Sequence, residues 1–373
     1  MDLRLERVSA MEIRPIEYYK PTVASTVARQ RDTWEAARRR EGGHVTFRAL
    51  LPSDVSMYDE IDLTSFNFED DIDAYCDLWA ELLFRSMNAR IGVEDNYIPY
   101  LSPMLGIGDY SAFVAGDIVF QRDTSWSAPQ LANVGDYVNL PPLGTSVWYG
   151  KLLAICENLI RMCARGGFPF LRGFFSPCDL AASLRGDQIY YDFYDDPDGL
   201  RGLLDYCADA IIYLAKDIYA LCDQYLSGTA FGRLYTSGVI NMSEDISCMI
   251  SGRLYREFCA PATQKVINAF GSGHMHSHSR AMYLVREICA LDHVTHLWLA
   301  TDPNQPRPIE HLGELVRDAR GTCLAIDCES FGEIEQNREL LKRGNFSICL
   351  PVKDRHEAME LNERFEALFY SDG

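Results

Sequence analysis

The chain has 373 residues and a mass of 42.3 kDa, which is enough for one large α/β barrel or for two domains of ordinary size. Hydrophobic residues make up 47% and charged residues 24%, a composition that excludes disorder and collagen-like repeats and predicts a folded globular protein. Its 35 Lys and Arg against 54 Asp and Glu give a net charge of −19, which repels phosphate backbones and anionic lipids. We therefore expect neither a nucleic-acid nor a membrane partner.

The amino-terminal segment carries scattered charges where a secretory signal needs an uninterrupted apolar stretch, and no run of about 18 apolar residues occurs anywhere. We expect a cytoplasmic protein. The twelve cysteines lack the compact spacing of a disulfide scaffold, and most fall within apolar helical patterns. They are expected to be buried free thiols.

The first part of the chain is expected to be helical. Segments 29–43 and 69–91 carry apolar residues at three- and four-residue spacing, with charged residues between them. We assign residues 1–95 to an N-terminal helical extension that packs on the following domain. Between Asn96 and Leu143, Pro, Gly and aromatic residues make the pattern irregular, as in long loops that flank short strands.

From Thr145 onward, apolar segments of strand length alternate with helical patterns. The expected strands are 168–175, 232–241, 271–279, 294–302, 322–328 and 345–352, and the expected helices are 145–167, 198–226, 251–270, 280–292, 308–321, 331–344 and 356–370. Strands that are apolar on both faces and alternate with helices predict a parallel sheet. Because no glycine-rich dinucleotide or phosphate-binding motif follows any strand, we favour a (β/α)8 TIM barrel over residues 96–373.

Three histidines stand at alternate positions near the end of one expected strand: His274, His276 and His278. Side chains two residues apart on a strand face the same side, and neutral imidazole is the commonest metal ligand. Catalytic zinc takes three protein ligands and keeps a fourth position open. We take His276 and His278 as candidate zinc ligands, with Cys349 as the third and Cys328 as its rival. The alternative is that the imidazoles line a polar barrel mouth or bind an anionic substrate, the role we give to the deeper His274.

Other polar residues follow apolar strands, where a parallel barrel places its chemistry. The candidate general acids or bases are Asp179, Asp245 and Asp302, although an aspartate can also cap a helix. The candidate substrate-binding residues are Arg122, Trp126, Arg172 and Asn241. An arginine can clamp a carboxylate or pair with an aspartate, and the tryptophan can stack on a flat substrate or anchor a loop.

Three segments taken in order, 174–209, 244–266 and 274–288, resemble the uroporphyrinogen decarboxylase superfamily. The resemblance rests on FFSPCDLAASLRGDQIYYDFYDDPDGL, on EDISCMISGRLYREFCAP and on HMHSHS, and it extends from about Asn96 to the end of the chain. It implies a TIM barrel. The superfamily contains metal-free porphyrinogen decarboxylases and zinc-dependent methyltransferases that move a methyl group between a corrinoid and a thiol.

In those methyltransferases the zinc ligands are a His-x-Cys pair on one strand and a cysteine near the last strand. By position, His276 matches the histidine, His278 stands where cysteine is usual, and Cys349 matches the final cysteine. The arginine-rich decarboxylase signature is missing, since Arg29-Gln30-Arg31 lies in a helical pattern without its continuation.

The leading hypothesis is therefore a zinc-dependent methyltransferase that uses a corrinoid on a partner protein and acts on a thiol or related acceptor. The alternatives are a metal-free decarboxylase of a porphyrinogen-like or other carboxylated substrate, and a non-catalytic barrel that binds a small molecule. The resemblance also leads us to expect a homodimer.

Overall fold

The computed structural model describes residues 12–226 and 238–370. The strands are β1 Val45–Leu50, β2 Ile118–Phe120, β3 Ser125–Ser127, β4 Gly173–Phe175, β5 Val239–Ser243, β6 Ser272–His278, β7 Val294–Ala300, β8 Cys323–Asp327 and β9 Asn345–Pro351. The first six residues of the strand expected at 232–241 lie outside the described residues.

The helices before β4 are α1 Ile16–Tyr19, α2 Val23–Arg39, α3 Pro52–Ser56, α4 Ile72–Ala89, α5 Asp109–Ala112 and α6 Val147–Gly166. Those after β4 are α7 Pro177–Arg185, α8 Ile189–Asp195, α9 Pro197–Tyr225, α10 Gly252–Leu254, α11 Ala260–Phe270, α12 Val285–Ile288, α13 Leu312–Ala319, α14 Phe331–Gln336, α15 Arg338–Leu341 and α16 Arg355–Tyr370. Helix α9 begins as predicted, because the Asp196 side chain accepts a hydrogen bond from Gly199 N and Pro197 occupies the first turn. No helix of the described residues is long and apolar enough to cross a bilayer.

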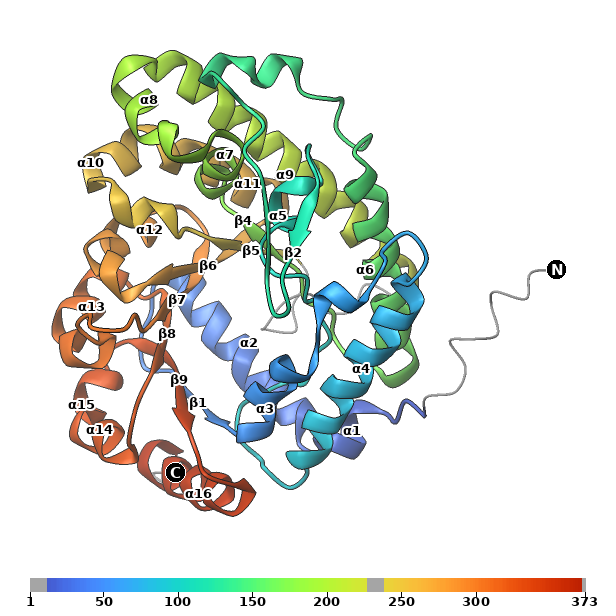
Figure 1. Cartoon of the computed structure of the whole chain (residues 1–373). Helices are drawn as coiled ribbons and strands as arrows, with labels where there is room; N and C mark the ends of the chain where they lie inside the picture. Colours follow the sequence, from blue (N-terminus) through green and yellow to red (C-terminus); the bar gives the residue numbers. More distant parts are fainter. Residues whose placement is uncertain (1–11, 227–237, 371–373) are drawn as a thin grey trace.

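Seven parallel strands form one curved sheet in the order β1-β9-β8-β7-β6-β5-β4, with helices around its outer side (Figure 1). Strands β2 and β3 form a separate antiparallel hairpin. The prediction of an α/β fold with a parallel sheet is confirmed. A closed eight-stranded ladder is not shown, because no regular ladder joins β1 to β4 in the described parts of the chain.

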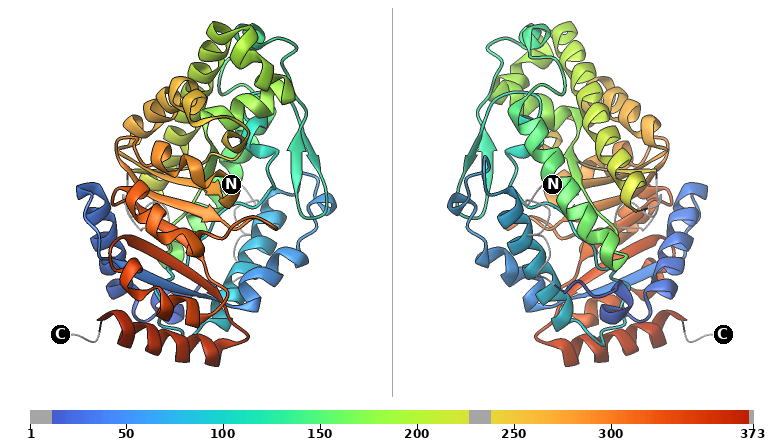
Figure 2. Two further views of the ribbon diagram at one scale, coloured as in Figure 1. Left: turned by 90° about the vertical axis from the view of Figure 1, so that its left-hand side faces the viewer. Right: turned by 90° about the vertical axis from the view of Figure 1, so that its right-hand side faces the viewer.

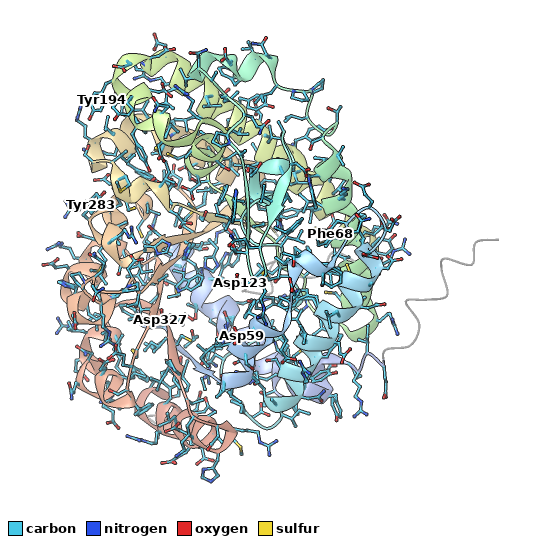
Figure 3. The ribbon with its side chains drawn as sticks, viewed as in Figure 1. Asp59, Phe68, Asp123, Tyr194, Tyr283 and Asp327 are labelled. Atoms are coloured by element: carbon cyan, nitrogen blue, oxygen red, sulfur yellow. The ribbon has the colours of Figure 1, made fainter. Side chains whose placement is uncertain are left out.

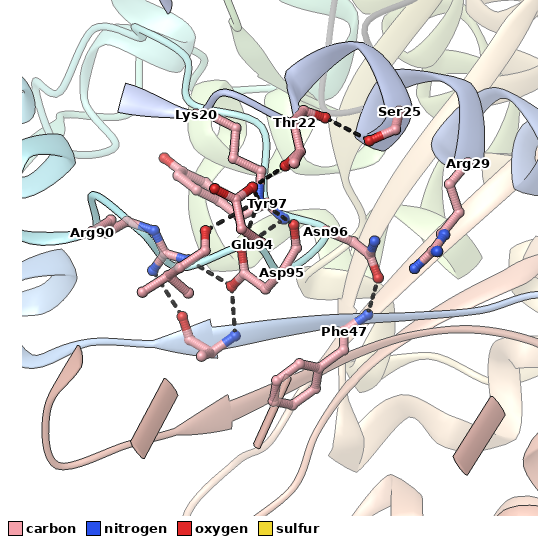
Figure 4. Close-up of polar contacts among 12 residues, drawn as sticks. Lys20, Thr22, Ser25, Arg29, Phe47, Arg90, Glu94, Asp95, Asn96 and Tyr97 are labelled. Carbon is pink, nitrogen blue, oxygen red and sulfur yellow. Dashed lines mark hydrogen bonds and ion pairs between the residues drawn. The ribbon is translucent and has the colours of Figure 1, made fainter. Parts of the chain in front are cut away.

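The segment from Asn96 to Leu101 bridges the two edge strands without forming a regular strand. Asn96 N donates to Phe47 O on β1, and Asn96 Oδ1 accepts from Phe47 N (Figure 4). At its other end, Leu101 forms an isolated parallel bridge with Phe170, just before β4. Pro99 lies between these contacts and has no backbone N–H to donate, which interrupts a ladder.

The first 95 residues do more than extend the fold with helices, because they supply β1. The short apolar segment VTFRAL pairs in register with β9, from Val45 opposite Phe346 to Leu50 opposite Pro351. The boundary expected at residue 95 therefore falls after the first strand of the sheet. A six-residue strand between two long helical patterns is difficult to predict, because so few residues do not establish a periodic pattern.

Helix α2 covers the end of the sheet where the strands begin. Trp34 Nε1 donates to Ser272 Oγ at 3.4 Å at the start of β6, and Arg40 Nη1 donates to Thr322 Oγ1 at 2.8 Å just before β8. Figure 2 shows α2 and the β2–β3 hairpin at opposite ends of the molecule, with the strand arrows pointing towards the hairpin. The carboxyl ends of the strands therefore form the open face.

The interior is a continuous apolar core that includes most of the cysteines. All twelve are free thiols, and only Cys248 and Cys349 are not buried. The prediction of buried free thiols is thus confirmed for the other ten.

Candidate functional site

Two imidazoles and one carboxylate meet where β5 and β6 end. His276 and His278 share one face of β6, and Asp245 lies two residues beyond β5, which pairs with β6. The Nε2 atoms of His276 and His278 lie 3.5 and 3.4 Å from Asp245 Oδ1, respectively. One ligand atom from each of the three residues lies within 4.8 Å of the others, and all three side chains are partly exposed. Two nitrogens and one oxygen suit a zinc ion that keeps an open position.

Asp302 orients His278 from the side away from this cluster. Its Oδ1 lies 2.9 Å from His278 Nδ1, and its Oδ2 accepts from the backbone N of Arg280 at 3.1 Å. With an ion bound, a proton on Nδ1 shared with Asp302 would leave the Nε2 lone pair for the metal, the arrangement found behind metal-bound histidines. The hydrogen bond with Asp245, aided by the charge of Asp302, raises the pKa of His278, although burial opposes the shift. These contacts would let Asp302 position His278, and its role as a general acid or base stays a prediction from the sequence.

Asp179 lies beneath the cluster and holds the backbone of Asp245. It accepts hydrogen bonds from Asp245 N and Ile246 N, both at 2.9 Å, and from Ser243 Oγ at 2.7 Å. Ser176 caps α7 by accepting from Asp179 N at 3.1 Å, which fixes the carboxylate in place. Burial and the charge of Asp245 raise the pKa of Asp179 to about 7. Its contacts are those of a support for Asp245.

Glu244 is a buried carboxyl group that the sequence did not single out. Hydroxyl groups surround it, and the contacts are Ser247 Oγ at 2.7 Å, Ser176 Oγ at 3.0 Å, Tyr255 OH at 3.2 Å and Thr263 Oγ1 at 3.4 Å. Burial, followed by the charge of Asp179, raises the pKa of Glu244 to about 8. The only sequence signal was an acid directly after an apolar strand.

This carboxyl group gives a testable pH dependence. Because an unfolded glutamate titrates near ~4.3, the folded chain holds an extra proton on Glu244 until the pH reaches its folded pKa of about 8. The free energy of unfolding therefore falls as pH rises through this window. Glu244→Gln should flatten that slope by up to about 1.4 kcal/mol per pH unit, as measured by urea unfolding across the window. Glu363→Gln, at an exposed position of α16, is the control, and equal slopes in the wild type and Glu244→Gln would contradict the assignment.

Asn241 and His274 line the same cavity as the cluster. The cavity has a volume of about 280 Å³, and Asp245, His276 and Trp298 also line it. His274 is buried one strand repeat deeper than His276, opposite Asn241 of β5. Trp298 lies against His276, with ring centres 4.5 Å apart, and limits the freedom of that imidazole. The structure thus brings together seven of the residues expected from the sequence, namely Asn241, Asp245, His274, His276 and His278, with Asp179 and Asp302 hydrogen-bonded to the cluster.

Cys349 is not part of this cluster. It lies on β9, three strands from β6, and lines a neighbouring cavity together with Cys328. Burial raises the pKa of Cys328 to about 12, which disfavours the thiolate that a metal needs. The structure places Asp245 beside the two imidazoles, where the sequence suggested a cysteine.

The two arginines and Trp126 also lie away from the cluster. Arg172 is buried, and its Nη2 contacts Asp109 Oδ2 at 2.6 Å, the ion pair that was the alternative to a carboxylate clamp. Arg122 and Trp126 belong to the hairpin, where Arg122 Nη2 donates to Asp59 O at 3.0 Å and Trp126 is exposed.

Comparisons with known proteins support the fold. No family model and no curated protein matches the chain. Among solved structures, a methyltransferase from Methanosarcina mazei aligns with a TM-score of 0.58 at 12% identity, over 90% of this chain and 98% of that one. The apo form of the homocysteine methyltransferase MmuM from Escherichia coli aligns at 12% identity over 52% of this chain and 95% of that one, with a TM-score of only 0.25. At this identity the first likeness supports the fold, and the second is too distant to carry an argument.

Proposed function

We propose that the protein is a metal-dependent methyltransferase with a zinc site formed by Asp245, His276 and His278. The observation that carries this proposal is the convergence of the three ligand atoms within 4.8 Å, with Asp302 bonded to the far nitrogen of His278. Zinc in such a site lowers the pKa of a bound thiol, so that the nucleophilic thiolate exists at neutral pH. The fold shared with a methyltransferase of known structure is consistent with this function.

The chain's own residues prepare the site in three ways. Asp302 holds the Nδ1 proton of His278, and Asp179 fixes the backbone of Asp245, so both side chains are oriented before substrate arrives. Trp298 lies against His276 and provides an apolar wall that excludes water from one side of the cavity. Asn241 offers an amide to a polar substrate group inside the cavity.

A metal-free decarboxylase receives less support. Such an enzyme needs cations near the carboxylates of its substrate. The described residues that line the cavity of about 280 Å³ include no lysine or arginine, and Arg172 is already paired with Asp109.

We further propose that the methyl donor is a corrinoid carried by a partner protein, and that the protein acts as a homodimer.

Metal binding by matched variants tests the proposal. We expect the purified protein to bind about one zinc per chain. Asp245→Asn should weaken zinc binding at least about tenfold, since a neutral amide replaces an anionic ligand, whereas Cys349→Ser should leave it unchanged. Competition with a chromophoric chelator measures both affinities, and Asp198→Asn, at a solvent-exposed position of α9, is the control. Loss of zinc in Cys349→Ser but not in Asp245→Asn would restore the cysteine as the third ligand.

A further inference from the structure

A second, larger cavity adjoins the histidine cavity at the open face of the sheet. Its volume is about 570 Å³, and it lies between the ends of β1, β8 and β9 and the segment around Met57 and Tyr58. Figure 3 labels Asp327, at the end of β8, and Asp59, next to Tyr58, which mark these two sides. Trp298 and Ser102 line both cavities, so the two cavities are direct neighbours.

The strand register sets the polar wall of this second cavity. Arg48 of β1 is the partner of Cys349 of β9, and Cys349 is the partner of Asp327 of β8. All three side chains line the cavity, so a cation, a thiol and a carboxylate form one row across neighbouring strands. The row places Arg48 and Asp327 two strands apart, about 10 Å between their backbones.

Arg48 offers hydrogen-bond donors to the cavity. Its guanidinium lies over the Tyr97 ring at 4.3 Å, and its closest carboxylate oxygen, on Asp54, is 4.0 Å away. Asp54 is already engaged, because it accepts from Arg90 Nη1 at 2.5 Å and from Ser86 Oγ at 2.8 Å. Within the described ranges, Arg48 Nε is buried and has no hydrogen-bond partner. A buried donor of this kind is costly unless a ligand or water satisfies it.

Arg90 cannot play the same role. Its guanidinium donates to Asp95 Oδ2 (Figure 4). It also donates to Asp54 Oδ2, and Asp95 accepts from the backbone N of Ala49. The guanidinium of Arg90 is therefore already paired with carboxylates, and these contacts hold the 94–97 segment against β1.

The remaining acidic groups restrict the ligand to a single negative charge. Arg307 contacts Glu329 at 3.2 Å and donates to both carboxylate oxygens of Glu333, so one cation faces two carboxylates and this group keeps a net negative charge. Asp327 faces the cavity at the level of Arg48 and disfavours a second acidic group on the ligand. The other walls are aromatic and apolar, and they include Tyr58, Tyr100, Trp298, Met57 and Met87.

We propose that this second cavity binds an aromatic monocarboxylate, with the carboxylate on Arg48 and the ring against Tyr100 and Trp298. Arginine pairs with a carboxylate through two parallel hydrogen bonds, and aromatic walls favour a flat ring over an aliphatic chain. The role of this ligand as a substrate rests on the proposed function. Its binding to Arg48 does not depend on that function.

Calorimetric titration of the full-length protein, stripped of metal by a chelator, tests this binding. The probe is 2-naphthoate, compared with 2-naphthamide, with 2,6-naphthalenedicarboxylate and with hexanoate. We expect 2-naphthoate to bind at least about tenfold more tightly than each of the others, which lack the charge, carry a second charge or lack the ring. Equal binding of the amide, or tighter binding of the dicarboxylate, would overturn the proposal.

Variants assign the binding to its residues. Arg48→Gln should weaken 2-naphthoate binding at least about tenfold. Arg48→Lys should weaken binding less, because lysine keeps the positive charge and loses only the pair of parallel donors. Asp327→Asn should strengthen binding of 2,6-naphthalenedicarboxylate, because it removes the negative charge that repels the second carboxylate. Arg317→Gln, exposed on α13, is the control. If Arg48→Gln does not fold by its melting curve, the Arg48→Lys result decides, and unchanged affinity there would overturn the assignment. Zinc binding is measured on separate samples. Absence of 2-naphthoate binding would therefore not contradict the zinc site, and absence of zinc binding would not contradict the carboxylate site.

Discussion

Replacing His278 with alanine will abolish stoichiometric zinc binding. The substitution removes one of the three proposed ligands and also the side chain that Asp302 contacts. Replacing His276 should have the same effect, since a two-ligand site binds zinc far more weakly. Asp302→Asn keeps all three ligands and loses only the charge behind His278, so we expect an affinity about 10- to 100-fold lower. Elemental analysis after dialysis gives the stoichiometry, and chelator competition gives the affinities.

The order of these effects is what distinguishes a metal site from a histidine pair that merely lines a pocket. His356→Ala, at an exposed position of α16, is the matched control and should keep wild-type zinc content. A pair that only lines the pocket would leave zinc content equal in all four variants, and that result would overturn the metal site. An Asp302→Asn protein that loses more zinc than His278→Ala would show that Asp302 is itself a ligand.

Arg172→Met will destabilise the protein by about 3–5 kcal/mol, the usual cost of leaving one member of a buried ion pair without its partner. Asp109 is fully buried, its contact with Arg172 is 2.6 Å long, and the Arg172 guanidinium also lies over the Tyr110 ring at 4.4 Å. Methionine fills part of the volume but leaves the Asp109 carboxylate uncompensated. Urea unfolding measures the loss.

Two further variants separate charge from packing at this pair. Arg172→Met combined with Asp109→Leu should regain part of the lost stability, because no isolated charge then stays buried. Arg317→Met removes an exposed ion pair and should cost less than about 1 kcal/mol. A stable Arg172→Met protein with weakened substrate binding would instead support the clamp that the sequence allowed.

The alternation of apolar strands and helices after Thr145 was enough to predict the parallel sheet and the helix at 198–226, which the structure has as α9 Pro197–Tyr225. Those elements have strong local signals, namely continuous apolar runs, an aspartate cap and a first-turn proline. The irregular segment from Asn96 to Leu101 has no such signal. Its place between β1 and β4 is decided by hydrogen bonds to distant strands, which one sequence does not display.

The same limit applies to the site. The two-residue spacing of His276 and His278 predicts that they share a face, because that is local strand geometry. The third member of the cluster depends on which strands are neighbours, and β5 pairs with β6 while β9 does not. The sequence therefore predicts acid–base chemistry for Asp245 and metal binding for Cys349. Nothing in the sequence singles out Glu244, because its hydroxyl partners are Ser176, before α7, and three residues spaced over 247–263 that only the fold brings together.

The pairing of β1 with β9 has a consequence for the order in which the protein is made. Thr46 Oγ1 donates to Phe346 O across 300 residues of sequence, and Arg29 of α2 pairs with Glu366 of α16. During synthesis β1 has no partner strand until the ribosome has produced β9, although Asn96 can already bond to Phe47. Contacts this distant slow folding, because a long loop must close before they form. The edge of β1 therefore stays unpaired for most of translation, when chaperones have their longest access to it.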